Sequence, residues 1–377
     1  MKNVLIRTIA VLVALFSSLL FISADGADED VQEKYSAYIL TEARTGAVLD
    51  EYNADLHLNA GYMSKLMSLL LIAEDIEEGK YTTDTVMTAS QAVSGTDGAV
   101  VWIEPAEKIT ADELLKAVIV GNANDAMTVL AEYSEQSVEN FVKRMNGRAF
   151  ELGLRDTAFF SPYGYYDERE HTTAHDIAII CAEISDKDVL EPYFCIWRDF
   201  VRGGKAELVN ENTFSRNFES HIGFKASHSE KSGYCIAEGG RDSDGTVYIA
   251  VVLGAESDDV SFSKAKDLIK KAFRGFHVTA TMFPDEMLMP IKVKNGTELA
   301  VEVKLKEQAD IVVPVGVSEL RTVVVLPDYL NAPLKKGQKI GTAGFYSGDT
   351  LACEIDIVVK NDVERLTFLY GFRQILL

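Results

Sequence analysis

The chain has 377 residues, of which 47% are hydrophobic and 25% charged, and its formal net charge at pH 7 is −21. This composition is that of a globular protein, and the length exceeds one average domain but falls short of three, so we expect one large and one smaller domain. Because so acidic a surface repels phosphate backbones, nucleic-acid binding is disfavoured.

The N-terminal residues predict export. Lys2 and Arg7 precede an apolar run over residues 9–22, which ends before two small residues. This is the pattern of a secretory signal peptide at residues 1–24. The run is short for a membrane span, so an uncleaved anchor is the weaker interpretation. Cleavage would remove both cations, leave the mature chain with a formal charge of −23 and place it outside the cytoplasm, in the cell envelope.

Residues 30–276 alternate between strand and helix patterns, which predicts an α/β domain. Strand patterns at both ends of this range predict one sheet assembled from N-terminal and C-terminal pieces. The expected elements are a hairpin over 36–53 with a turn at Thr45 and Gly46, helices over 64–79, 110–135 and 137–154, a central strand over 248–255 and a helix over 261–276.

Residues 277–362 consist of short β-rich runs separated by glycine, proline and asparagine turns, which predicts a small all-β domain. The tail, residues 363–377, is too short to cross a bilayer. Four of its apolar residues can share one helical face: Leu366, Leu369, Tyr370 and Leu376. A peripheral contact with the membrane and packing against the β domain are both open for this tail.

Five segments resemble, in order and spacing, the penicillin-binding D-alanyl-D-alanine carboxypeptidases of bacterial cell walls. They read TGAVLDEYNAD, NDAMTVLAEY, MNGRAFELGLRDTAFFSPYGYYDE, SGYCIAEGGRDSDGTVYIAVVLGA and LNAPLKKGQKIG. The resemblance implies a β-lactamase/transpeptidase-like α/β domain, with a five-stranded antiparallel sheet flanked by helices, and a small β-sandwich-like C-terminal domain. It also implies a role in peptidoglycan metabolism without a cofactor or a metal.

This family resembles penicillin-binding proteins generally in using three elements, S-x-x-K, S-x-N and K-T-G. In the first, serine and lysine lie on one helical face, so the amine can take the hydroxyl proton. The second serine relays that proton. The third element is an edge strand whose lysine attracts the terminal carboxylate of the peptide and whose glycine leaves room for it.

All three elements are altered in this chain. They fall on Tyr62, Met63, Ser64 and Lys65, on Asn122, Ala123 and Asn124, and on Lys225, Ala226 and Ser227. The resemblance therefore assigns the catalytic positions to Lys65, Asn122 and Asn124, with Tyr62 at the nucleophile position, and substrate binding to Lys225, Ala226 and Ser227. A structural explanation for Lys65 and Asn124, as a buried hydrogen-bonded pair, is also open.

The exchange at the nucleophile position weighs most against catalysis. The ring of Tyr62 would fill the space of the acyl group, and a phenol with a pKa of about 10 is a poor nucleophile at neutral pH. Losing the serine of a catalytic unit costs roughly 10⁶ in rate, as in subtilisin. Ser64 points to another side of the helix from Lys65. Ser68 shares the face of Lys65 but lies a turn deeper, so it is the weaker alternative nucleophile.

Two further groups of residues suggest chemistry less strongly. His171 and His175 have the spacing of helical zinc ligands, but a helix capped by Thr172 or Thr173 would leave His171 outside it, and we expect no metal. His228 would stand beside the groove, on an edge strand. The four cysteines are far apart in apolar patterns and are interpreted as buried thiols.

The sequence thus predicts an exported, catalytically inactive homologue that binds a peptidoglycan stem peptide or a cell-wall enzyme. The alternative is an active serine-type carboxypeptidase that trims the terminal D-alanine from pentapeptides through a rearranged nucleophile such as Ser68.

Overall fold

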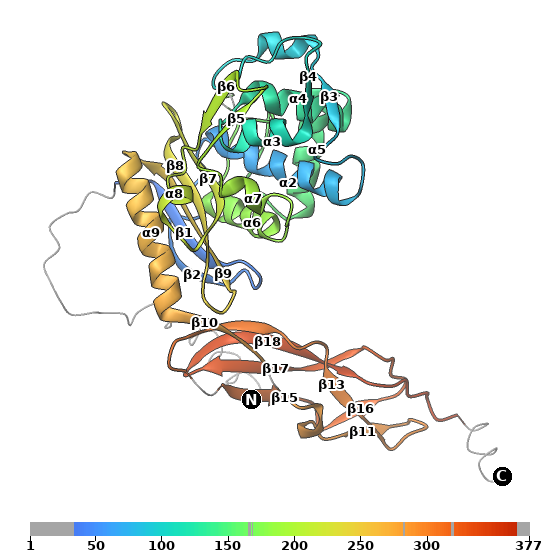
Figure 1. Cartoon of the computed structure of the whole chain (residues 1–377). Helices are drawn as coiled ribbons and strands as arrows, with labels where there is room; N and C mark the ends of the chain where they lie inside the picture. The colour runs from blue at the N-terminus through green and yellow to red at the C-terminus, as the bar shows by residue number, and fades with distance from the viewer. Residues whose placement is uncertain (1–33, 165–166, 168, 282, 318–319, 368–377) are drawn as a thin grey trace, which may run out of the picture. The chain divides into compact units, whose positions relative to one another are not determined.

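A computed structural model describes residues 34–164, 167, 169–281, 283–317 and 320–367 (Figure 1). The predicted signal peptide and residues 368–377 of the tail lie outside this part of the chain. Within it, no helix combines the length and the apolar character that a bilayer span requires.

The α/β region contains one five-stranded sheet, as predicted. Its strands follow the order β2 (Val48–Tyr52), β1 (Ala37–Glu42), β9 (Val247–Ala255), β8 (Gly233–Arg241) and β7 (His221–Ser229), and every neighbouring pair is antiparallel. The first and last parts of this region therefore meet where β1 pairs with β9, which confirms the assembly expected from the sequence. β7 is an edge strand.

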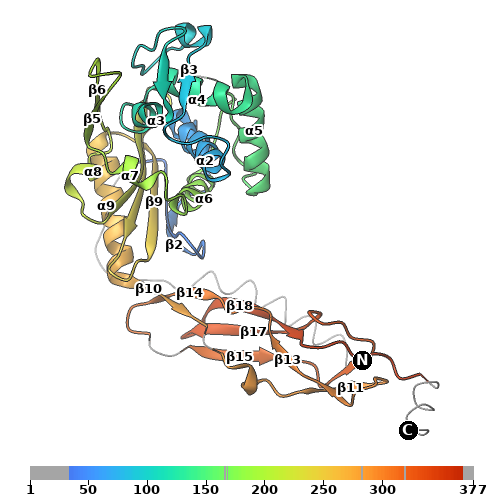
Figure 2. The same cartoon turned by 45° about the vertical axis from the view of Figure 1, so that its right-hand side comes forward.

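Helices cover both faces of this sheet. α9 (Asp258–Gly275) packs against β8 and β9 on one face, and α6 (Ala174–Ser185) packs against β1 and β9 on the other (Figures 1 and 2). Behind α6 lies α2 (Ser64–Glu77), preceded by the short helix η1 (Gly61–Met63). Apart from two helices between β4 and α5, the other elements of this region are β3 (Val86–Thr88), η2 (Gln91–Gly95), β4 (Lys108–Thr110), α5 (Val138–Glu151), α7 (Glu191–Phe194), β5 (Arg198–Val201), β6 (Ala206–Val209) and α8 (Phe214–Asn217).

The stretch predicted as helical over 110–135 is two helices, α3 (Ala111–Ile119) and α4 (Asn124–Glu135). Thr110 caps α3 as predicted, accepting a hydrogen bond from the backbone N–H of Glu113 at 3.2 Å. The chain breaks because Asn122 adopts a left-handed conformation with φ 54°, which a continuous helix cannot contain. At this break, the backbone carbonyl and the side-chain amide of Asn122 can accept hydrogen bonds from other elements.

α2 is buried on nearly all sides, since 11 of its 14 residues are buried. Polar residues on such a helix lie in the protein core, where an unpartnered polar or charged group is costly. Lys65, Ser68 and Asp75 are each 0% exposed. The hydrogen-bond partners of these side chains therefore determine whether the buried charge at each end of the helix is compensated.

The C-terminal region is all-β, as predicted, apart from η3 (Asp285–Met287). Its strands form sheets of β10 (Phe276–Ala280) with β14 (Asp310–Pro314), of β12 (Ala300–Val301), β11 (Ile291–Lys294) and β16 (Tyr329–Asn331), and of β13 (Val303–Leu305), β18 (Thr350–Val359), β17 (Lys339–Ser347) and β15 (Arg321–Val325). The start of the tail packs here, because Val363 is buried and bridges to Leu334. Leu366 is exposed.

All four cysteines are free thiols. Cys181 and Cys235 are buried, as predicted. The prediction is wrong for Cys195, which is exposed because it follows the last turn of the short surface helix α7, and Cys353 is only half-buried.

Candidate functional site

Three segments far apart in the sequence bring two lysines to one asparagine. Lys65 comes from the first turn of α2, Asn122 from the break between α3 and α4, and Lys225 from the edge strand β7. The Nζ atoms of Lys65 and Lys225 donate hydrogen bonds to Oδ1 of Asn122 at 2.7 and 2.8 Å. Lys65 Nζ also donates to the Asn122 backbone carbonyl at 2.8 Å. One neutral amide oxygen thus accepts hydrogen bonds from two ammonium groups.

Burial makes both cations costly. Lys65 is 0% exposed and Lys225 is 6% exposed. Burial and the nearby Lys225 charge hold the pKa of Lys65 well below its ordinary value, against the opposing effects of Glu211 and Asp125. Burial lowers the pKa of Lys225 to about 8, with Glu211 again opposing. Neither ammonium forms an ion pair with a carboxylate in the described part of the chain, so the pair lacks a contacting counter-charge.

Glu211 is the nearest approach to such a counter-charge. Its carboxylate accepts a hydrogen bond from Asn122 Nδ2 at 3.4 Å and acts on the two lysines through the electrostatic field. This bond orients the amide, because it fixes Nδ2 toward Glu211 and leaves Oδ1 for the lysines. Glu211 is itself exposed to solvent. Glu211 therefore does not supply a carboxylate in direct contact with either ammonium.

Tyr62, at the nucleophile position, presents its ring to the amine. Nζ of Lys65 lies over this ring, 4.5 Å from its centroid, in a cation–π contact. Among the described residues, both hydrogen bonds of Lys65 Nζ go to Asn122, and none goes to a hydroxyl. Lys65, to which the resemblance assigns the role of the base, is therefore not hydrogen-bonded to a hydroxyl of the described residues.

The two serines near Lys65 have other partners. The Ser64 hydroxyl donates to the carboxylate of Glu170, whose pKa is raised by burial to about 7 despite that hydrogen bond. The Ser68 hydroxyl donates to the backbone carbonyl of Pro162 at 2.6 Å. Neither serine is hydrogen-bonded to Lys65, so the structure gives no support to a rearranged nucleophile.

Asn124 does not pair with Lys65, so the structural explanation considered from the sequence is wrong. Its Nδ2 donates to the carbonyl of Asp97 at 2.7 Å, because Asn124 begins α4 and faces the 97–103 loop. Its Oδ1 is buried without a partner among the described residues, as is Oγ of Ser227 on β7. Buried polar atoms of this kind call for an explanation, and a bound ligand or water would satisfy them. Ala226 belongs to the apolar cluster on the α9 side of the sheet.

The histidines take structural positions. Thr173 caps α6, accepting a hydrogen bond from the N–H of Asp176 at 3.0 Å, so His171 precedes the helix as predicted. The described residues contain no group of three side chains suited to hold a metal ion. His228 on β7 is exposed and stacks on the ring of Tyr234, with the centroids 4.1 Å apart.

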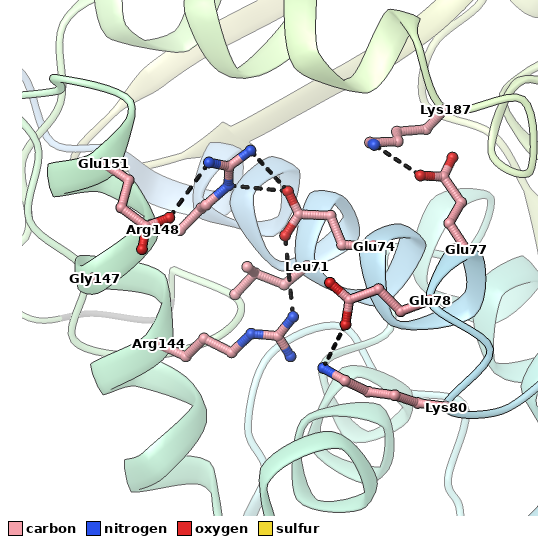
Figure 3. Close-up of a pocket in the computed structure, with 10 residues that line it drawn as sticks. All are labelled: Leu71, Glu74, Glu77, Glu78, Lys80, Arg144, Gly147, Arg148, Glu151 and Lys187. Carbon is pink, nitrogen blue, oxygen red and sulfur yellow. Dashed lines mark hydrogen bonds and ion pairs between the residues drawn. The ribbon is translucent and has the colours of Figure 1, made fainter.

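A cavity of about 790 Å³ lies at the other end of α2 and was not expected from the sequence (Figure 3). Charged side chains line it, and Figure 3 shows them paired with one another: Glu74 lies between Arg144 and Arg148, and Lys187 contacts Glu77. Because these charges are compensated, they are explained as structural ion pairs. The sequence contained one signal for this cluster: Arg144 and Arg148 are four residues apart, so both lie on the same face of α5.

Comparisons with known proteins agree with this fold. The profile of the D-alanyl-D-alanine carboxypeptidase family matches residues 25–257, and that of the penicillin-binding protein 5 C-terminal domain matches residues 278–365. The chain is 27% identical over 368 residues to D-alanyl-D-alanine carboxypeptidase DacF of Bacillus subtilis, covering 96% of this chain and 94% of that protein. It is 28% identical over 337 residues to DacC of Escherichia coli, covering 87% and 84%.

Among solved structures, penicillin-binding protein 5 from Haemophilus influenzae matches with a TM-score of 0.80 at 24% sequence identity. The match covers 90% of this chain and 100% of that one, so it extends over both the α/β and the β region. Because the family profile matches more than half of the chain, the chain belongs to the D-alanyl-D-alanine carboxypeptidase family.

Proposed function

We propose that this chain is an exported, non-catalytic member of its family that binds peptidoglycan stem peptides through their terminal carboxylate. The observation that carries the proposal is the convergence of Lys65 and Lys225 on Asn122 Oδ1 without a contacting carboxylate. A peptide carboxylate would supply the counter-charge that these buried ammonium groups lack.

The geometry beside Lys65 supports the absence of catalysis. Serine-type acyl transfer needs a nucleophile within hydrogen-bond reach of its base. Lys65 Nζ instead bonds to Asn122 and lies over the Tyr62 ring. Loss of the nucleophile alone removes roughly 10⁶ in rate, on the order of 8 kcal/mol. The remaining groups then support binding rather than turnover.

Lys225 is the residue best placed to contact the peptide. It lies on the edge strand β7 and keeps 6% exposure, whereas Lys65 is fully buried. Ser227 follows two residues later, on the same side of a regular strand, and its hydroxyl lacks a partner in the described part of the chain. An extended peptide along this edge would meet both side chains.

Export rests on the pattern of residues 1–24 and on the cell-wall substrates that the names of the relatives imply. N-terminal sequencing of the protein recovered from the producing cells tests it. A mature terminus near residue 25 is expected, and an intact Met1 in a cytoplasmic fraction would refute it.

Fluorescent penicillin tests the catalytic part of the proposal. The purified mature chain should show no covalent label on a denaturing gel, and it should release no D-alanine from a stem pentapeptide. Either a stable adduct or catalytic release of D-alanine would show that the chain is an enzyme, and digestion of the adduct would identify its nucleophile.

Calorimetric titration with a stem pentapeptide tests the binding part. Lys225→Ala should weaken binding at least tenfold, whereas Lys266→Ala, which removes an exposed lysine on α9, should leave it unchanged. A peptide with an amidated C-terminus should bind as weakly as the Lys225→Ala variant binds the free acid. Near pH 8, binding should also take up protons, because an added anion raises the pKa of Lys225 from about 8. Equal binding of acid and amide would refute recognition of the terminal carboxylate, and absence of binding to either peptide would leave a cell-wall enzyme as the candidate ligand.

A further inference from the structure

Trp102 has an unusual conformation and an unusual exposure. Its φ is +60°, in the left-handed region that bulky side chains rarely enter, and its side chain is 79% exposed. An exposed side chain gains little from packing, so packing does not explain why the backbone is held in this strained state. Strain of this kind is concentrated at functional sites, where the surrounding structure maintains it.

The surrounding structure holds Trp102 from both flanks. The buried carboxylate of Asp125 accepts hydrogen bonds from the N–H groups of Val101 at 3.1 Å and Ile103 at 2.9 Å. Arg202 donates to the Val101 carbonyl at 2.7 Å and is itself anchored by two hydrogen bonds to Glu107, at 2.6 and 2.7 Å. Two buried, charged side chains thus fix the residues on either side of the indole. The loop is built to hold Trp102 in place.

Beside the indole lies a cavity of about 320 Å³. Its other lining residues are Val93, Ser94, Thr96, Val100, Ile103, Glu104, Pro105 and Asp125. None of them is basic, so the cavity does not favour a phosphate or a carboxylate. It combines an aromatic face and aliphatic walls with two hydroxyls and the Glu104 carboxylate, which forms no hydrogen bond or ion pair with the described residues. Its size is at the lower end of ligand pockets, about 300–1,000 Å³.

We propose that this cavity binds one sugar ring of a peptidoglycan glycan strand. A sugar ring is neutral and has C–H groups on one face and hydroxyls around its edge. The C–H face would pack on the indole, whose face carries partial negative charge, while ring hydroxyls donate to Glu104 and hydrogen-bond with Ser94 and Thr96. These are the groups that the cavity offers.

The position of the loop supports a polymer as the ligand. The backbone N–H of Asn124 donates to the carbonyl of Ala99 at 2.7 Å, and its side chain donates to Asp97 at 2.7 Å. The loop is thereby attached to the residue that begins α4, two positions after Asn122. The inference extends the proposed binding of peptidoglycan, but it depends on other residues and on another part of the ligand.

Tryptophan fluorescence can test the inference directly, with the uncharged trisaccharide of N-acetylglucosamine as the probe. The chain has two tryptophans, so Trp197→Phe leaves Trp102 as the sole tryptophan emitter. The trisaccharide should change that emission in a saturable manner. In the otherwise native chain, Trp102→Ala should weaken trisaccharide binding at least tenfold, Trp102→Phe should retain part of it, and Glu104→Gln should weaken it several-fold.

Trp102→Gly is the control for folding. Glycine adopts the left-handed conformation without strain, so the melting temperature of this variant should be no lower than that of the native chain. Its binding of the trisaccharide should nevertheless be lost. Stem-pentapeptide binding should be unaffected by Trp102→Ala, and trisaccharide binding should be unaffected by Lys225→Ala, so either proposal can fail alone. Absence of a saturable emission change, or equal trisaccharide affinity of Trp102→Ala, overturns the inference and leaves an apolar protein segment as the better candidate for this cavity.

Discussion

The two ends of helix α2 bury opposite charges in different ways. At its C-terminal end, Asp75 accepts hydrogen bonds from Lys80 at 2.5 Å, Arg144 at 3.0 Å and Ser134 at 2.5 Å. Burial raises the pKa of Asp75, but these bonds outweigh burial and the pKa lies below its ordinary value. At the N-terminal end, Lys65 meets a neutral amide and an aromatic ring, and its pKa lies well below its ordinary value.

This difference distinguishes a structural charge from the proposed binding site. A buried charge with close, oppositely charged partners maintains the fold, and removing one partner is destabilising. A buried charge whose contacts are neutral is held at a cost that a ligand of opposite charge could offset. The cavity of about 790 Å³ lies beside the compensated charges and not beside Lys65 and Lys225 (Figure 3).

Restoring the family residues at the N-terminal end should have the largest effect. The fourfold variant Tyr62→Ser, Asn122→Ser, Ala226→Thr and Ser227→Gly should be labelled covalently by fluorescent penicillin, because a hydroxyl would again stand beside Lys65. The gain in acylation rate could reach ~10⁶ over the parent chain. The control retains Tyr62 and carries the other three changes, and it should stay unlabelled. Label on that control would show that Tyr62 is not what prevents acylation.

Removing the compensated charge should have the next largest effect. Asp75→Ala should lower the free energy of unfolding by about 3 kcal/mol, because it leaves Arg144 and Lys80 without their buried partner. Urea denaturation measures this change. Glu78→Ala is the matched control, since Glu78 is exposed and contacts Lys80 at 3.2 Å, and it should cost less than about 1 kcal/mol. Equal losses in the two variants would remove the distinction between the ends of α2.

The pH dependence of stability should reveal the uncompensated end. Lys225 loses its proton at a pH of about 8 in the folded state but keeps it to about 10.4 when unfolded. The unfolded state therefore binds more protons in this window, and stability rises with pH. The free energy of unfolding of the native chain, measured relative to that of Lys225→Met, should rise by about 2 kcal/mol between about pH 7.5 and about pH 9.5. A flat difference would mean that Lys225 has a counter-charge.

The smallest effect should come from removing Lys65. Lys65→Met keeps a long, unbranched side chain and removes a buried cation, so the free energy of unfolding should rise by about 1 kcal/mol. Asn122 Oδ1 would still accept from Lys225. Thermal and urea denaturation measure the change, and Lys65→Gln tests whether a neutral donor suffices. A loss of more than about 2 kcal/mol in both variants would make Lys65 a structural residue rather than part of a site.

The fold could be predicted largely from pattern and resemblance. The apolar run over β9, the cap at Thr110 and the turn at Gly46 are local signals that the tertiary structure follows. The break at Asn122 was not predicted, because the residues on either side of it continue a helical periodicity. A left-handed conformation held by tertiary contacts leaves no trace in such a pattern.

The candidate site was predicted in its residues but not in its bonds. Resemblance brought Lys65, Asn122 and Lys225 together, yet the pairing of both lysines with one amide oxygen depends on the side-chain geometry at the helix break. Trp102 was missed altogether, because neither a left-handed φ nor exposure can be inferred from a lone tryptophan in a loop. The roles of the seven family positions stay predictions.

The left-handed backbone of Asn122 has an evolutionary consequence. Asparagine enters this conformation several-fold more readily than most residues other than glycine, so a serine placed there would restore a hydroxyl and strain the chain. That hydroxyl would also be useless while Tyr62 remains, because catalytic groups act as a unit. For the non-catalytic function proposed above, a return to hydrolysis would therefore require at least two substitutions together, at Tyr62 and at Asn122.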